Sequence, residues 1–321
     1  MRRFVAVRFV HAVVVLFLVA TIAFFLIHLA PGDPFSFDAP NITPQLRAQW
    51  RAAFGYDRPV SEQYWMYLRN VASGQLGYSH SLRVDVRQAL AIFVPRTLLL
   101  MSLALFISFA LGIRLGIYEA LHWRKPRARA SNAASLFVYS LPDFWLALML
   151  LLAFAYWLPV LPAGGLIDPV LHDYMDPAAA LWDRVRHLLL PLVTLTLIIT
   201  ALVARYQRAA LLDTMPADFV RTARAKGVEE RWVVGRHALR NALLPMITLA
   251  GLVFPALLGG AVFVERVFSW PGMGLMVVNA ISTRDYPLVM AGVVVGAIMV
   301  AIGNLLADLA YGLADPRVRV R

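Results

Sequence analysis

The chain has 321 residues, a net charge of +11 at pH 7 and no cysteine, and 60% of its residues are hydrophobic. Soluble domains average about 45–50% apolar and about 25% charged residues, whereas 15% of this chain is charged. This composition predicts an α-helical membrane protein with several spans. The lack of cysteine excludes disulfides, thiolate metal sites and cysteine nucleophiles.

Short loops rich in arginine and lysine separate the apolar runs of the chain. This placement fits the positive-inside rule better than a nucleic-acid-binding surface. The segments on the side of both termini hold 18 basic residues, and those on the other side hold 10. We therefore expect an all-α polytopic membrane protein with both termini in the cytoplasm. Its six transmembrane helices are expected at residues 9–30, 97–118, 133–158, 188–204, 242–264 and 287–311.

The chain is expected to have three parts. Residues 1–30 form the N-terminus and an uncleaved first helix, because the bond after Ala30 makes a poor signal-peptidase site. Residues 31–95 form a small insertion on the outer side. Residues 96–321 form the core with helices two to six, and a polar cytoplasmic loop over residues 205–241 joins the fourth helix to the fifth.

Three local signals refine this division. In the outer insertion, Thr43 is expected to cap a helix over residues 43–70 that begins with Pro44. Pro142 is expected to break the beginning of the third span. Pro191 is expected in the first turn of the fourth span, where proline is tolerated.

The polar loop carries eight basic and four acidic side chains between Arg205 and Arg240. A charge at the centre of the bilayer costs about 2.5–3.5 kcal/mol even on the lenient insertion scale, so this loop must lie in water. Asp213 or Thr214 can cap a first helix, and Gly227 can end it in the left-handed conformation. A second helix can follow, with acidic residues in its first turn and arginines near its end.

The first helix of this expected hairpin should expose small side chains, Thr222, Ala223 and Ala225, to a close partner. An alternative is a helix that lies on lipid headgroups. The apolar residues available for that role are few, namely Phe219, Val220 and Ala223, so a protein partner is favoured.

Two stretches of the polar loop, FVRTARAKG at 219–227 and RHALRNALLP at 236–245, resemble the cytoplasmic "EAA" loop of ATP-driven importer permeases. In particular, they resemble the dipeptide/oligopeptide/nickel permease family. Arg221 stands where the general motif has glutamate and Thr222 where it has alanine, as is usual in this branch. Further similar stretches follow in order along the chain: APGDP at 30–34, SLPDFW at 140–145, LPAGG at 161–165, FSWPG at 268–272 and ADPR at 314–317.

The resemblance implies a type I importer permease fold and a set of partners. These are a second, homologous permease subunit, two ATPase subunits that bind ATP and magnesium, and a periplasmic or lipid-anchored solute-binding protein. The resemblance also implies a location in the bacterial inner membrane and no cofactor in this chain. The residues expected to couple to the ATPase are Asp218, Phe219, Arg221, Thr222, Ala223, Arg224, Ala225, Lys226 and Gly227.

No catalytic residue is expected, since the sequence has no phosphate-binding loop, nucleophile elbow or zinc-binding helix motif. No metal site is expected either. His172, Asp173 and Asp176 could meet a cation, but a solvated loop is the better interpretation, because hydrated carboxylates select nickel poorly.

Four residues are candidates for the translocation path or its gate: Pro255, Gly259, Asn304 and Asp308. Asn304 and Asp308 are four residues apart and share a helix face. Asp308 could instead pair with Arg114 as a packing residue. Pro255 and Gly259 could bend the fifth span, although close helix packing explains its glycines equally well.

The substrate is left open by the sequence, because the family moves dipeptides, longer peptides, glutathione, nickel chelates and other solutes. An importer of nickel chelates or of another small solute is therefore an alternative. A secondary transporter or channel without ATPases is an alternative from another class. It would call for ionisable residues at mid-membrane or for paired broken helices. An intramembrane hydrolase would need nucleophile motifs that the sequence lacks.

Overall fold

The computed structural model describes residues 2–29, 45, 49, 55 and 57–314, with side chains described outside 2–6, 254–260 and 308–314. These residues are mostly helical, and the only strands among them form a short antiparallel hairpin of β1 (Tyr78–Ser79) and β2 (Val84–Asp85). Contacts divide the chain into two compact units. Unit 1 contains residues 1–95 and 276–301, and unit 2 contains residues 96–275 and 302–321.

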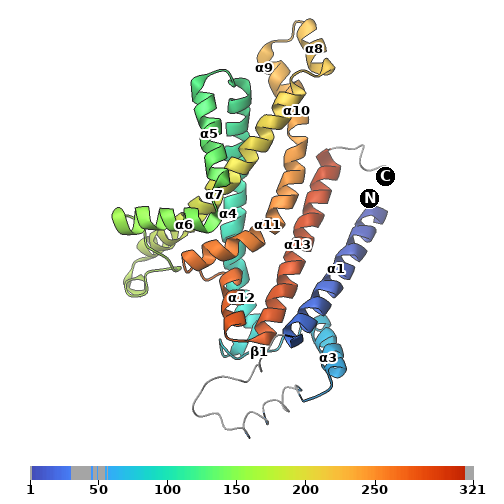
Figure 1. Ribbon diagram of the computed structural model, residues 1–321, viewed down its shortest axis with the longest axis vertical. Helices are drawn as coiled ribbons and strands as arrows, with labels where there is room; N and C mark the ends of the chain where they lie inside the picture. The colour runs from blue at the N-terminus through green and yellow to red at the C-terminus, as the bar shows by residue number, and fades with distance from the viewer. Residues whose placement is uncertain (1, 30–44, 46–48, 50–54, 56, 315–321) are drawn as a thin grey trace. The chain divides into compact units, whose positions relative to one another are not determined.

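In unit 1, α1 (Arg2–Leu29) packs against α3 (Val60–Ala72), a helix of the outer insertion (Figure 1). The ring of Phe24 is buried, and it stacks on Tyr67 of α3 with centroids 5.5 Å apart. Burial of aromatic rings is a large stabilising contribution, so this contact holds α3 against α1. The helix expected in the insertion is thus confirmed at its C-terminal end, while its expected cap Thr43 lies outside the described residues.

The β-hairpin of unit 1 is held by Asp285, which directly precedes α13 (Tyr286–Ala314). The Oδ2 atom of Asp285 accepts hydrogen bonds from Ser79 Oγ at 2.6 Å, Ser81 N at 2.9 Å and Ser81 Oγ at 2.7 Å. Its Oδ1 atom accepts from Leu288 N at 3.3 Å, within the first turn of α13. The fully buried carboxylate therefore joins the hairpin to the start of this helix.

Unit 2 is organised around α7 (Pro177–Thr214), which packs against α5 (Pro126–Ser140), α6 (Asp143–Leu151) and α11 (Leu244–Val267) (Figure 1). Helix α6 continues as a π-helical turn over Leu152–Trp157. The core also takes apolar side chains from α4 (Val86–Leu121). Buried members of this core include Leu100, Ala147, Leu195, Val203 and Val264.

Two glycines of α4 set its distance from α7. A Cβ atom at Gly112 would lie 2.6 Å from Val203 Cβ, and one at Gly116 would lie 2.5 Å from the backbone oxygen of Ala204. Both separations are below any normal contact, so only glycine permits this approach. The Gly-x-x-x-Gly spacing is typical of close helix packing in membranes.

Four helices among the described residues are long and apolar enough to cross a membrane, at 7–29, 86–121, 177–214 and 286–307. The pair α5 and α6–Trp157 would add a fifth if it counts as one span. Helix α11 lies over all but the first two residues of the expected fifth span, and its apolar stretch with described side chains is Leu244–Val253. The described structure therefore confirms the all-α polytopic class, and the count of six stays a prediction.

The break expected at Pro142 is confirmed: the chain bends by 103° between Ser140 and Asp143, because Leu141, which precedes Pro142, is extended with ψ 138°. The expected bounds of the fourth span are corrected. Helix α7 begins at Pro177 rather than at residue 188, because Asp176 caps it by accepting from the N–H groups of Ala178 and Ala179. Pro191 consequently lies inside α7 and not in a first turn.

Candidate functional site

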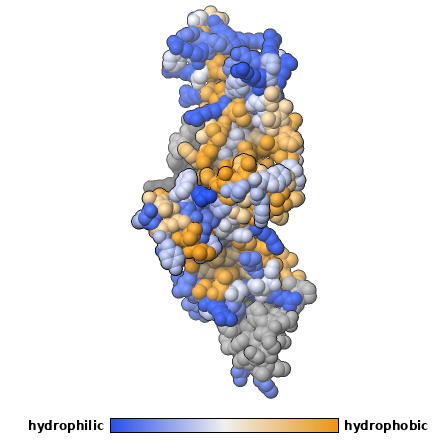
Figure 2. All heavy atoms as spheres, turned by 90° about the vertical axis from the view of Figure 1, so that its left-hand side faces the viewer, coloured by the Kyte–Doolittle hydropathy of each residue, from blue (hydrophilic) through white to orange (hydrophobic). Residues whose placement is uncertain are grey.

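The polar loop folds into a helical hairpin at one end of unit 2, hereafter the 218–242 hairpin. Its first arm is α8 (Asp218–Ala225). Its second arm begins as α9 (Glu230–Trp232), passes through a π-helical turn over Val233–Ala238 and ends as α10 (Leu239–Ala242). Figure 1 shows the hairpin between the end of α7 and the start of α11, and Figure 2 shows hydrophilic residues gathered at this end of the unit.

Helix α8 starts later than the sequence indicated. Asp213 and Thr214 still belong to the last turn of α7, where Thr214 Oγ1 donates to the backbone oxygen of Ala210 at 2.7 Å. The N-cap residue of α8 is Ala217, which makes no side-chain capping bond. Asp218 lies in the first turn, where a negative charge is favourable beside the helix dipole.

Gly227 ends α8 as expected. Its φ of +76° is in the left-handed region, which favours glycine. The N–H of Gly227 donates to the backbone oxygen of Arg224 at 2.9 Å, and the N–H of Val228 donates to that of Ala223 at 3.2 Å. These two bonds form a Schellman motif. A Cβ atom at Gly227 would meet no atom within 4 Å, so the backbone angle and not packing requires glycine here.

The inner face of α8 is formed by Val220 and Ala223, three residues apart. They are 0% and 6% exposed. They belong to a small core cluster with α7 and the second arm that includes Leu211, Val233, Ala238 and Ala242. The expectation that Ala223 faces a partner is therefore wrong: its small side chain allows α8 to lie close to its own unit.

The outer face of α8 contains Asp218, Arg221, Thr222 and Ala225, spaced i, i+3, i+4 and i+7 along the helix. All four are exposed. Thr222 Oγ1 donates to the backbone oxygen of Asp218 at 2.8 Å, so its methyl group and Ala225 provide a small-residue surface. Phe219, on the flank of this face, is 44% exposed.

A bidentate ion pair joins the two arms of the hairpin. Arg224 Nε donates to Glu230 Oε2 at 3.0 Å, and Arg224 Nη2 donates to Glu230 Oε1 at 2.7 Å. The hydrogen bonds from Arg224 lower the pKa of the Glu230 carboxyl, and those to Glu230 raise the pKa of Arg224. Because two of its three guanidinium nitrogens bind the carboxylate, the side chain of Arg224 helps to set the angle between the arms.

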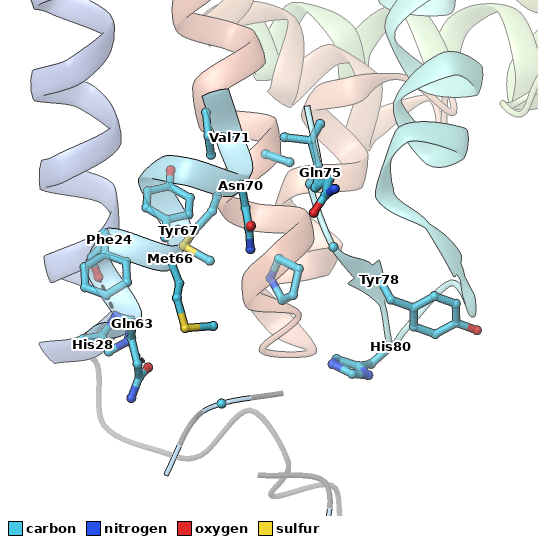
Figure 3. Close-up of a pocket in the computed structure, with 16 residues that line it drawn as sticks. Phe24, His28, Gln63, Met66, Tyr67, Asn70, Val71, Gln75, Tyr78 and His80 are labelled. Atoms are coloured by element: carbon cyan, nitrogen blue, oxygen red, sulfur yellow. Dashed lines mark hydrogen bonds between the residues drawn. The ribbon is translucent and has the colours of Figure 1, made fainter. Parts of the chain in front are cut away.

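A second candidate site is a cavity of about 220 Å³ in unit 1, between α1, α3, the β-hairpin region and the start of α13 (Figure 3). Partial burial lowers the pKa of His80 there, opposed by the charge of Asp285. Burial raises the pKa of Tyr67 to about 12. Among the described residues the lining has no carboxylate, lysine or arginine, and combines aromatic and thioether groups with amides and imidazoles: Phe24, His28, Gln63, Met66, Tyr67, Asn70, Gln75, Tyr78, His80 and Met290.

Three of the four path candidates have side chains outside the described part of the structure. Asn304 is exposed on α13. Pro255 and Gly259 lie in α11 and Asp308 in α13, at positions whose side-chain environment lies outside the described part. The expected pairing of Asp308 with Arg114 therefore also lies outside it. For the neighbouring Gly251 the packing explanation holds, since a Cβ atom there would overlap Ala307.

The candidate cation group of the outer loop is not a cluster. His172 is buried, and its Nδ1 atom lies 2.7 Å from Asp183 Oδ2, while Asp176 caps α7. The expectation of a solvated loop is thus wrong for His172, which a carboxylate of α7 fixes in place. No group of three potential ligands among the described residues is placed to hold a metal.

Comparison with known proteins identifies the family. A family model described as "Binding-protein-dependent transport system inner membrane component" matches residues 112–320. A model of the N-terminal part of such membrane components matches residues 1–101. The chain belongs to this family. It is therefore a multi-pass inner-membrane subunit of a transporter and not an enzyme. Importers of this kind work with an ATPase and a solute-binding protein, which decides against a secondary transporter or channel.

Individual relatives cover nearly the whole chain. A Brucella ovis protein provisionally named a peptide permease is 41% identical over 301 residues, 92% of each chain. The di/tripeptide transport system permease protein of Pseudomonas aeruginosa is 38% identical over 334 residues, 99% of each chain. The glutathione transport system permease protein of Escherichia coli O6:H1 is 34% identical over 322 residues, 100% of each chain.

Proposed function

We propose that this chain forms one half of the translocation path of an ATP-driven importer for di- and oligopeptides. The names of its relatives support peptides over nickel chelates, since glutathione is itself a tripeptide. A second, homologous permease subunit completes the path. Two ATPase subunits bind ATP and magnesium, and a periplasmic or lipid-anchored protein delivers the solute. Both termini of this chain are cytoplasmic, and the chain itself holds no cofactor.

The outer face of α8 is the observation that supports coupling to the ATPase. This face is exposed, while the opposite face is buried against α7 and the second arm. A displacement of α8 would therefore be transmitted to α7 through this contact, and to α11 through α10. The coupling residues are Asp218, Phe219, Arg221, Thr222, Ala225, Lys226 and Gly227, with Ala223 and Arg224 holding the hairpin together.

Nucleotide binding can drive transport only if it favours one state of the path over the other. A nearly complete shift between two states needs about 5.5 kcal/mol of differential binding. In our proposal the ATPase supplies this difference through the hairpin. Pro255 and Gly259 of α11 form the gate, and Asn304 and Asp308 of α13 line the path, because these two helices carry the polar and helix-breaking positions of the late spans.

Replacement of Gly227 tests the proposal in the complete complex reconstituted in proteoliposomes. Valine at this left-handed position strains the backbone behind α8, and we expect ATP-dependent peptide uptake to fall at least about tenfold. Gly74→Val is the matched control, since Gly74 has a φ of +73°, a Cβ atom there would also meet nothing within 4 Å, and it lies in the outer insertion. Unchanged uptake by the Gly227 variant, or purified complexes without ATPase subunits, would overturn the proposal.

A further inference from the structure

The two charged side chains on the outer face of α8 bind each other weakly. Arg221 Nη1 lies 3.8 Å from Asp218 Oδ1, and the two side chains are 71% and 98% exposed. Ion pairs of such exposure contribute about 0–1 kcal/mol, because water screens them. The contact with Asp218 therefore does little to hold the guanidinium of Arg221.

Arg224, in the same helix, has hydrogen-bond partners within the hairpin and so differs from Arg221. Two of its nitrogens bind the Glu230 carboxylate at 3.0 and 2.7 Å. Arg224 thus serves the hairpin itself, whereas Arg221 projects from the small-residue surface of Thr222 and Ala225. Neither of these small side chains would obstruct a partner that approaches the guanidinium.

We propose that the ATPase subunit presents a carboxylate to Arg221, within a groove that receives Thr222 and Ala225. This inference rests on the proposed function, because it takes the ATPase as the protein that docks on α8. A guanidinium binds a carboxylate through two parallel hydrogen bonds, which fixes orientation as well as position. Residues 217–241 carry six basic and three acidic side chains, so the hairpin as a whole attracts an acidic surface.

The burial pattern disfavours anionic lipid headgroups as the partner of Arg221. A helix that lies on a membrane turns its apolar residues towards the lipid. In α8 the apolar Val220 and Ala223 face the interior of unit 2, and Phe219 is left as the single large apolar side chain exposed on this helix. The exposed surface is polar and small, as suits a protein groove.

Charge reversal in the complete complex tests the inference. Arg221→Glu should weaken the affinity of the permease for its ATPase subunits at least about tenfold, as expected for the loss of a charge-assisted hydrogen-bonded pair. Changing the contacting carboxylate residue of the ATPase to arginine should restore most of the affinity. Arg231→Glu is the matched control, because Arg231 is 72% exposed and also lies near a carboxylate, 2.8 Å from Glu229, but on the second arm.

Four outcomes would overturn the inference. The first is an equal loss in the Arg231 variant, which would assign the effect to overall charge. The second is a loss that disappears in vesicles of phosphatidylcholine alone, which would assign the contact to anionic lipid. The third is unchanged affinity in Arg221→Glu while Phe219→Ala weakens it, which would leave the proposed function standing. The fourth is unchanged ATPase binding in both variants, which would overturn the proposed function as well.

Discussion

Thr97 and Glu265 are 168 residues apart in the chain and share a buried hydrogen bond in unit 2, in which Thr97 Oγ1 donates to Glu265 Oε1 at 2.6 Å. The same Thr97 oxygen accepts from the N–H of Met273 at 2.7 Å, and Glu265 Oε2 accepts from that of Leu275 at 2.9 Å. The pair therefore ties α4 to the turn between α11 and α12 (Met273–Ser282).

Glycines make this arrangement possible. A Cβ atom at Gly272 would overlap the Glu265 carboxylate, and one at Gly164 would overlap the backbone oxygen of Phe268. Gly165 N donates to the same Phe268 oxygen at 2.8 Å. Two stretches that resemble the permease family, at 161–165 and 268–272, thus meet in one contact region of unit 2.

Thr97→Val removes the hydroxyl group and keeps the shape of the side chain. The Glu265 carboxylate loses a donor and the N–H of Met273 loses its acceptor, so we expect the complex to lose about 1–3 kcal/mol of stability. Thermal unfolding of the purified complex in detergent measures this loss. Thr97→Ser, which keeps the hydroxyl, should lie near the wild type. A valine variant as stable as the serine variant would contradict the role given to this bond.

Gly116→Val tests the contact between α4 and α7. The added side chain would meet the Ala204 oxygen and Gln207 Cβ. Overpacking of a tight interior typically lowers stability by about 1–3 kcal/mol. Here the nearest atom belongs to the backbone, which cannot rotate away as a side chain can. We expect a lower melting temperature and a reduced yield of assembled complex. Gly235→Ala is the control, because its Cβ atom would have open space; equal losses in both variants would rule out a specific close contact.

The sequence predicted features whose signals are local. The left-handed stop at Gly227 and the order of charges in the 218–242 hairpin are properties of neighbouring residues, and the structure has both. The start of α7 is also predictable from neighbouring residues, because Asp176 followed by Pro177 is typical of an N-cap and the first helical position. The apolar run alone predicts a later start, because the helix extends beyond that run.

Features that depend on distant residues could not be predicted. Thr222 and Ala223 are both small, and only the packing of α8 on α7 decides that Ala223 points inward. Nothing near Thr97 in the chain indicates that its partner is Glu265. The spacing of Gly112 and Gly116 is a local signal of close helix packing, although it does not show which helix they contact.

The ion pair between Arg224 and Glu230 predicts a pH dependence of the hairpin. Because the pKa of Glu230 is lowered in the folded state, its contribution is present above the ordinary glutamate pKa of about 4.3. The contribution is lost as the pH falls through the lowered value. We expect the amide protection factors around Arg224 to Val233, that is, exchange relative to the intrinsic rate at each pH, to fall in acid in the wild type. Glu230→Gln should exchange faster already at pH 7 and show a weaker acid effect. An identical pH profile in both proteins would contradict the predicted role of this pair.

Asp285→Asn tests the link between the β-hairpin of unit 1 and α13. Oδ2 of Asp285 accepts three hydrogen bonds from Ser79 and Ser81. An amide nitrogen in its place is itself a donor, so it could not accept these three hydrogen bonds. Leaving buried donors without an acceptor costs about 1–3 kcal/mol. We expect faster hydrogen exchange and easier proteolysis over residues 78–85.

Asp85→Asn serves as the control for this variant, because Asp85 is exposed and its Oδ1 atom accepts from Arg87 N within the local turn. Ser81→Ala should have an intermediate effect, since one of the three hydrogen bonds to Oδ2 comes from the Ser81 hydroxyl. If residues 78–85 exchange and are cleaved equally slowly in the Asp285 and Asp85 variants, the buried carboxylate does not hold the hairpin. A graded loss from Ser81→Ala to Asp285→Asn would show that the Asp285 side chain holds the β-hairpin to the start of α13.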